Sequence, residues 1–131
     1  MTTITNWKEG SVFESTQPDA GTVVLDGDRV KGMSPKAALL AGLAACSGID
    51  IVDILHKMRV SFSDFSIQTD ADQTEESPKV FKEINMIYTI KVDEGDKEKV
   101  KKAVDLSMEK YCGVAAMLRK NSAIVFSVNY L

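Results

Sequence analysis

The spacing of apolar positions changes several times along the chain and divides it into strands and helices. Short β-prone runs stand at residues 12–13 and 22–25, and the turn-forming sequence Gln-Pro-Asp-Ala-Gly separates them at 17–21. Residues 29–33 then form a loop. The first part of the chain is therefore predicted to be β structure.

Residues 34–58 make up the longest apolar segment and predict a helix. Ser34 and Pro35 mark its start, because a serine caps a helix and the first turn does not need the N–H that proline lacks. Apolar side chains cover most of the circumference, which is typical of a buried helix. Its roughly 24 residues would form a rod of about 36 Å, longer than so small a core requires. We therefore expect a partner chain to cover part of it, with Gly42 and Gly48 where another backbone packs closely.

Strand patterns return after this helix. Residues 60–69 are β-prone, and residues 70–79 form a polar, acidic loop. Apolar and polar positions then alternate over residues 84–92, as in a half-buried strand.

The last part of the chain holds two shorter helices and a strand. A turn at 93–96 precedes an amphipathic helix, whose apolar stripe runs from Val100 through Ser107 to Met108. A short helix is predicted from Cys112 to about residue 119, then a turn at 121–122 and an alternating strand over 124–130. Strands at both ends with helices between them predict an α+β fold with a mainly antiparallel sheet.

Composition narrows the class of protein. The 131 residues, 44% of them hydrophobic and 27% charged, fit one globular domain spanning residues 1–131. A net charge of −3, a pI near 5.2 and the lack of a basic cluster argue against a nucleic-acid partner. We expect no membrane partner, because no run of about 18 consecutive apolar residues occurs. The first residues lack the features of a signal peptide, so a cytoplasmic location is expected.

Two cysteines carry the candidate chemistry. Cys46 lies in the middle of the long predicted helix, and Cys112 stands at the start of a short one. In a reducing cytosol a disulfide is more often transient and catalytic than structural. With a single histidine and no CxxC motif, no metal and no cofactor are expected. The pair fits a two-cysteine redox site, and it equally fits two unrelated core cysteines.

A reactive cysteine would need electrostatic help in this sequence. Only the thiolate attacks peroxides, yet an apolar helix is expected to disfavour a buried charge, and an ionised Asp50 would add a like charge one helical turn from Cys46. A supporting cation is therefore required, and Arg29 and Lys36 are the candidates. At Cys112, free N–H groups and the dipole of a following helix would favour the thiolate.

The remaining ionisable residues of the long helix have simpler interpretations. His56 is read as a polar residue near a helix end, where a cation suits the macrodipole, rather than as an acid or base. Asp50 and Asp53 share one side of the helix, and capping or hydrogen bonding to another chain is expected of them.

The segments around Cys46 and Cys112 resemble the signatures of a known family. Ser34 and Pro35, followed by Leu-Leu-Ala-Gly-Leu-Ala-Ala and by Cys46 eleven positions after the proline, resemble the first signature of the OsmC/Ohr family. This family comprises osmotically induced protein C and the organic hydroperoxide resistance proteins. Residues 46–59 look like the OsmC-like subgroup in particular, and Cys-Gly-Val-Ala at 112–115 falls at the second signature. The likeness spans nearly the whole chain.

The resemblance implies an OsmC-like intertwined homodimer with a long buried central helix in each subunit. It implies reduction of a small organic hydroperoxide at the dimer interface, with Cys46 as the peroxidatic cysteine and Cys112 as the resolving one. A dithiol reductant would then reset the site.

Several positions depart from the family pattern and support an alternative. The family's peroxidases place a glutamate just after the proline and an arginine in the early strands. Here Lys36 replaces the glutamate, and Arg29 is the only arginine before the helix. At the second signature, Gly113 and Ala115 replace proline and serine. The alternative is a non-catalytic module that binds a small apolar or thiol-reactive ligand, so whether the chain is an enzyme stays open.

Overall fold

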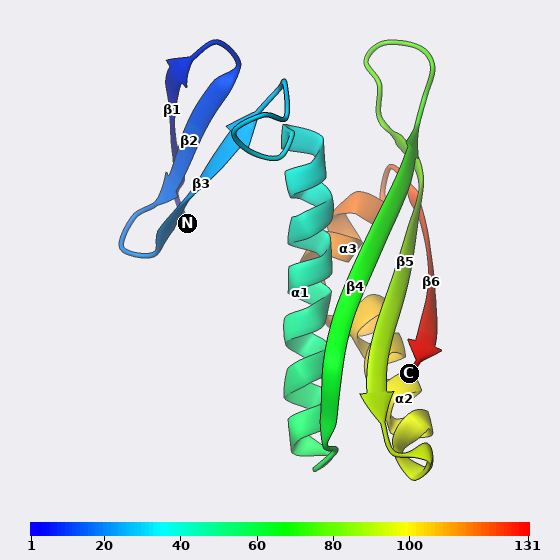
Figure 1. Cartoon of the computed structure of the whole chain (residues 1–131). Helices are drawn as coiled ribbons and strands as arrows, with labels where there is room; N and C mark the ends of the chain where they lie inside the picture. The colour runs from blue at the N-terminus through cyan, green and yellow to red at the C-terminus, as the bar shows by residue number, and fades with distance from the viewer. The chain divides into compact units, whose positions relative to one another are not determined.

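The computed structural model describes residues 1–131, and the chain forms two compact units, Met1–Ala41 and Gly42–Leu131. A single domain over the whole chain stays a prediction. The first unit holds an antiparallel sheet of β1 (Ile4–Glu9), β2 (Val12–Gln17) and β3 (Gly21–Asp26), in that order (Figure 1). Strand β1 was not predicted, because all six of its residues are exposed and no apolar face marks it.

A buried aspartate organises the loop after β3. The carboxylate of Asp26 accepts the backbone N–H groups of Asp28, Val30 and Lys31 at 2.8, 3.1 and 2.9 Å. These bonds, led by that from Lys31, hold the pKa of Asp26 below its usual value. Gly32 is required in the same loop, because a Cβ there would lie 2.3 Å from the carbonyl oxygen of Val24.

The long helix is present as α1 (Pro35–Lys57), and its predicted start is confirmed. The Ser34 hydroxyl accepts the backbone N–H of Ala37 at 3.3 Å. Only one face of α1 is buried, by Leu43, Ser47, Gly48, Ile51 and Leu55. The expectation of burial around most of its circumference is therefore not met within one chain. Its most apolar window reaches a mean hydropathy of 1.9 with 22% of its residues buried, so length and composition alone would also allow a membrane span.

The second unit contains a separate sheet, ordered β4 (Phe62–Gln73), β5 (Phe81–Val92) and β6 (Ala123–Tyr130). β4 and β5 pair antiparallel, whereas β5 and β6 pair parallel. The polar segment predicted as a loop from residue 70 is partly strand, because its backbone continues to pair with β5 up to Gln73.

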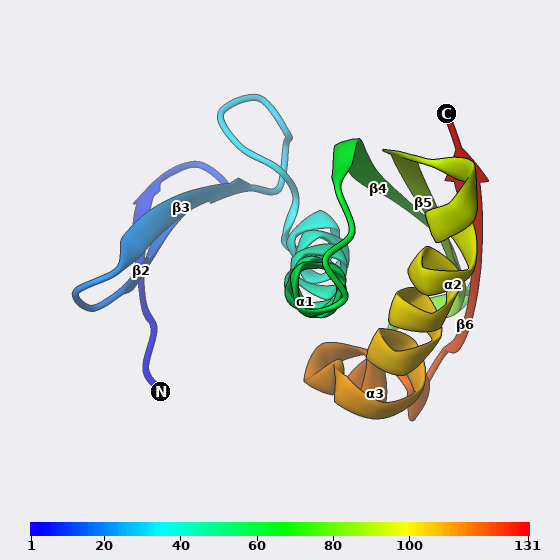
Figure 2. The ribbon, with the colours of Figure 1, turned by 90° about the horizontal axis from the view of Figure 1, so that it is seen from below.

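The helical elements of the second unit are α1 from Gly42 on, a short 3₁₀ turn η1 (Glu94–Asp96), α2 (Lys97–Leu106), a π-helical segment η2 (Ser107–Tyr111) and α3 (Gly113–Arg119). Figure 2 shows α1 and α2 on the same side of the sheet. Fully buried side chains of β5 form the sheet side of the core: Ile84, Met86, Tyr88 and Ile90.

The two glycines of α1 differ in their surroundings. A Cβ at Gly48 would lie 3.2 Å from the side-chain methyl of Ile67 on β4, so a side chain rather than a backbone packs closely there. A Cβ at Gly42 would meet nothing within 4 Å. The predicted close backbone packing is thus not found within the chain at either position.

Candidate functional site

Cys46 lies on α1 next to the buried face of the helix. Its side chain is partly exposed, whereas Ser47 and Gly48, which follow it, are buried. The position follows from helical periodicity: Leu43 and Ser47 belong to the stripe that faces the core, and Cys46 lies at its edge. The Cys46 sulfur is therefore neither a fully packed core atom nor a fully solvated one.

Cys112 lies at the junction between the π-helical segment and α3. It is the N-cap of α3, as predicted, and its sulfur accepts the backbone N–H of Ala115 at 3.4 Å. Its own N–H donates to the carbonyl of Ser107 at 2.8 Å, the five-residue spacing of a π-helical turn. Only 4% of Cys112 is exposed.

The fold brings the two cysteines together although 66 positions separate them in the sequence. Both are free thiols, and Cys46 lies near enough to Cys112 to raise the pKa of the Cys112 thiol. Burial is the main cause that raises the pKa of Cys112 to about 11, and Cys46 and Asp50 raise it further. The Ala115 N–H acts in the opposite direction, as the helix-start argument predicted, but burial outweighs it. Cys112 is therefore a protonated thiol at neutral pH.

A chain of buried hydroxyl groups lies beside the cysteine pair. The hydroxyl oxygens of Ser47 on α1 and Tyr88 on β5 are 2.6 Å apart. The Ser107 hydroxyl lies 3.0 Å from that of Ser47 and 3.0 Å from a carboxylate oxygen of Asp50. Burial raises the pKa of Tyr88 to about 12, although its bond to Ser47 lowers it.

Sequence reasoning did not single out these hydroxyl groups as part of a site. Two signals were present: Ser107 interrupts an apolar helical stripe, and Tyr88 places a polar tip on the buried face of a strand. Buried polar groups need partners, so each signal indicated a buried hydrogen bond. Asp50, for which capping or an interchain bond was expected, accepts a hydrogen bond from Ser107 within its own chain, and the interchain bond stays a prediction.

Comparison with known proteins identifies the family of this fold. Residues 26–127 match the family model described as OsmC-like protein. The chain belongs to the OsmC-like family. Protein YhfA of Escherichia coli K12 is 35% identical over 122 residues, which cover 92% of this chain and 91% of that protein.

Two solved structures show how widely the OsmC-like fold extends. The OsmC-like protein of Mycoplasma pneumoniae is 20% identical, with a TM-score of 0.85 over 99% of this chain and 96% of that one. The organic hydroperoxide resistance protein OhrB of Bacillus subtilis is 18% identical, with a TM-score of 0.64 over 98% of both chains. At these identities the likeness concerns the fold.

The cations predicted to support a thiolate belong to the first unit of this OsmC-like chain. Arg29 lies in the loop after β3, with a φ of 59°, and Lys36 lies in the first turn of α1. Both cysteines belong to the second unit. Support of Cys46 by Arg29 or Lys36 therefore stays a prediction.

His56, the single histidine, has an aromatic neighbour. It is exposed near the end of α1 and stacks on Phe62, with the ring centres 5.8 Å apart.

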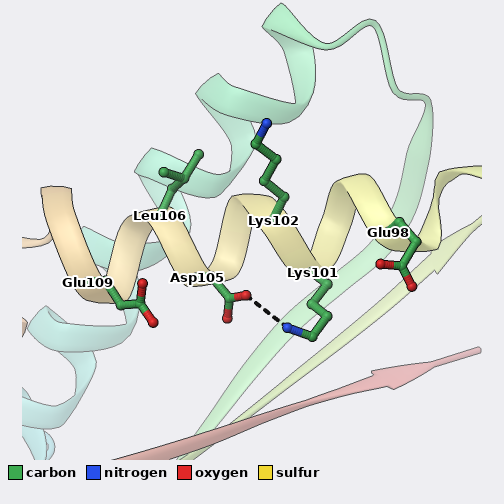
Figure 3. Close-up of a pocket in the computed structure, with 6 residues that line it drawn as sticks. All are labelled: Glu98, Lys101, Lys102, Asp105, Leu106 and Glu109. Carbon is green, nitrogen blue, oxygen red and sulfur yellow. Dashed lines mark hydrogen bonds and ion pairs between the residues drawn. The ribbon is translucent and has the colours of Figure 1, made fainter.

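A shallow hollow of about 220 Å³ lies along α2 (Figure 3), lined by Glu98, Lys101, Lys102, Asp105, Leu106 and Glu109. Lys101 and Asp105 form a 2.9 Å ion pair at its centre. Its lining contains no cysteine, so it does not belong to the cysteine site.

Proposed function

We propose that this OsmC-like protein is a thiol-dependent reductase of organic hydroperoxides, with Cys46 as the peroxidatic and Cys112 as the resolving cysteine. The observation that carries the proposal is the interaction between these two distant cysteines in one folded unit. Membership of the family supports it, as does the fold shared with a protein named for organic hydroperoxide resistance.

The different surroundings of the two thiols support the assignment of their roles. Cys46 is partly exposed, so a peroxide can reach its sulfur, whereas Cys112 is buried. A thiol whose pKa is raised to about 11 is almost entirely protonated at neutral pH and is a poor first nucleophile. This environment suits a thiol that acts only after its neighbour has been oxidised.

The proposed reaction has two steps on the protein. The Cys46 thiolate attacks an oxygen of the hydroperoxide, the O–O bond breaks, and the alkoxide takes a proton and leaves as the alcohol. The Cys46 sulfenic acid remains. The Cys112 sulfur then attacks the Cys46 sulfur, the S–O bond breaks, and the departing hydroxide takes the Cys112 proton to form water. A dithiol reductant returns two electrons and two protons to the disulfide, which fits the expected cytoplasmic location.

A positive charge near Cys46 would stabilise its thiolate. Asp50, whose negative charge raises the pKa of Cys112, does not supply it. Arg29 or Lys36, from the same or a partner subunit, is proposed to supply the compensating charge.

We further propose that a second copy of the chain covers the exposed face of α1. Leu39 and Ile49 on this helix are 52% and 63% exposed, in a window of which only 22% is buried. Contiguous apolar surface of this kind usually marks an interface. Light scattering is expected to give twice the chain mass of 14.3 kDa, and a monomer at micromolar concentration would contradict the proposal.

The non-catalytic binding module is the second candidate. It is favoured by Lys36, Gly113 and Ala115, which depart from the family's signatures. In this case the site would hold a small apolar or thiol-reactive ligand without turning over peroxide.

Titration with an organic hydroperoxide separates the two functions. One equivalent of cumene hydroperoxide is expected to remove two free thiols per chain and to form an intrachain Cys46–Cys112 disulfide. Cys112→Ser is expected to stop at the sulfenic acid or to over-oxidise, whereas Cys46→Ser leaves Cys112 unreacted. Glutathione at the same pH is the free-thiol control. If neither cysteine reacts faster than glutathione, the binding module is the better function.

A further inference from the structure

Ser107 links the backbone before Cys112 to the helix that carries Cys46. Its carbonyl accepts the Cys112 N–H at 2.8 Å, and its hydroxyl lies 3.0 Å from both Asp50 and the Ser47 hydroxyl. Ser47 is the residue after Cys46, and Asp50 lies one helical turn further along. Ser107, a single buried residue, is therefore bonded both to the backbone of Cys112 and to residues close to Cys46.

We propose that Ser107 is a positioning residue that holds the π-helical turn against α1 and so keeps the Cys112 thiol within bonding reach of Cys46. This inference rests on the two-cysteine site of the proposed function. Ser107 itself does not touch the reacting atoms.

The Ser107 hydroxyl donates from the π-helical turn toward α1. Its proton faces three acceptors: a carboxylate oxygen of Asp50 and the Ser47 hydroxyl, both at 3.0 Å, and the Ser47 carbonyl at 3.3 Å. The Ser47 hydroxyl is in turn 2.6 Å from that of Tyr88. A carboxylate only accepts hydrogen bonds, and its charge strengthens the bond that it receives. The bond to Asp50 is therefore the strongest of the three that hold the turn against α1.

The π-helical turn explains why the hydrogen bonds of Ser107 to α1 affect the position of Cys112. A π-helical turn contains one residue more than an α-helical turn, so it changes the direction of every residue that follows it. Here it begins at Ser107 and ends immediately before Cys112. A disulfide needs its Cα atoms within about 4.4–6.8 Å, so the position of the turn decides whether Cys112 can reach Cys46.

The test is the equilibrium between the two thiols and glutathione, which requires no peroxide. One oxidised glutathione takes two electrons and two protons from Cys46 and Cys112, giving the intrachain disulfide and two reduced glutathiones. Ser107→Ala is expected to lower this equilibrium constant about tenfold, because an unpinned Cys112 has a lower effective concentration at Cys46. Ser107→Thr, which keeps the hydroxyl, is expected to restore most of it.

Ser122→Ala is the matched control. Ser122 is also a buried serine, 3% exposed, and its hydroxyl donates to the carbonyl of Phe81 at 2.8 Å, away from the cysteines. It is expected to change the equilibrium constant by less than about twofold, because it leaves the effective concentration of the thiols unchanged. Asp50→Ala removes the charged acceptor of the Ser107 hydroxyl at a partly exposed position. It is the second variant if Ser107→Ala does not fold, and the same fall is expected.

The outcomes separate this inference from the proposed function. A selective fall in Ser107→Ala supports positioning even if the wild-type protein does not reduce peroxide. A wild-type equilibrium constant in Ser107→Ala overturns positioning even if peroxide is reduced. An equal fall in Ser122→Ala overturns it too, as does a wild-type chain that forms no intrachain disulfide with glutathione.

Discussion

The Tyr88 hydroxyl offers a direct test of the buried hydroxyl chain. Tyr88→Phe removes one hydroxyl from a side chain that is 0% exposed and otherwise keeps its shape. Its 2.6 Å bond to Ser47 is lost, but Ser47 keeps Ser107 as a partner, so no serine is left unpaired. We therefore expect a cost of about 1–2 kcal/mol in the free energy of unfolding, close to that of one buried hydrogen bond.

Guanidinium unfolding at a fixed protein concentration measures this cost. The midpoint is expected to fall without a change in slope, since the change in exposed surface is the same. In a thermal scan, the expected fall is about 3–8 °C for a chain of this length.

Two other tyrosines supply controls for Tyr88→Phe. Tyr130→Phe removes a hydroxyl that donates to the Lys97 carbonyl at 3.0 Å on a partly buried ring, so its cost should be smaller. Tyr111→Phe alters a ring that is 54% exposed and should be neutral. If Tyr88→Phe is as neutral as Tyr111→Phe, the hydroxyl chain does not stabilise the fold and this reasoning is refuted.

Three further predictions follow from individual side chains. Asp50→Asn should lower the pKa of Cys112, because the charge of the Asp50 carboxylate raises that pKa. Thiolate absorbance against pH in a Cys46→Ser background measures the change, and an unchanged titration midpoint would contradict the prediction. Asp26→Asn should lower the melting temperature at pH 7, because the pKa of Asp26 is depressed in the folded state. That stabilisation is present above the unfolded pKa of about 3.9 and is lost as pH falls through the pKa of Asp26 in the folded state. The difference in melting temperature between variant and wild type should therefore close in acid. A difference that does not depend on pH would refute the role of the charge. Leu55→Ala should cost about 2–5 kcal/mol in denaturant unfolding, because Leu55 is 0% exposed and its truncation leaves a cavity, whereas a cost under about 1 kcal/mol would show that the site collapses.

Local signals in the sequence determined most of the secondary structure. The Ser34-Pro35 start located α1, and alternation located β5 and β6, because capping and periodicity act over a few neighbouring residues. Strand β1 and the far end of β4 escaped prediction because pairing of the backbone, rather than an apolar face, defines them.

Local motifs were also enough to indicate the two cysteines and the family. The family model match over residues 26–127 confirms the resemblance that the motifs carried. Motif spacing, however, contains no information on burial. It therefore did not determine that burial would dominate the pKa of Cys112 and outweigh the N–H of Ala115.

Only the tertiary structure decided what surrounds the thiols. Ser47, Tyr88 and Ser107 come from three separate elements, and their hydrogen bonds exist only once α1, β5 and the π-helical turn are packed together. The π-helical turn is likewise absent from the apolar pattern, which continues through Ser107 and Met108 as an α-helical stripe would. The sequence by itself thus determined which residues are candidates for the chemistry. Long-range packing decided their burial and charge environment, because these depend on contacts between residues far apart in the chain.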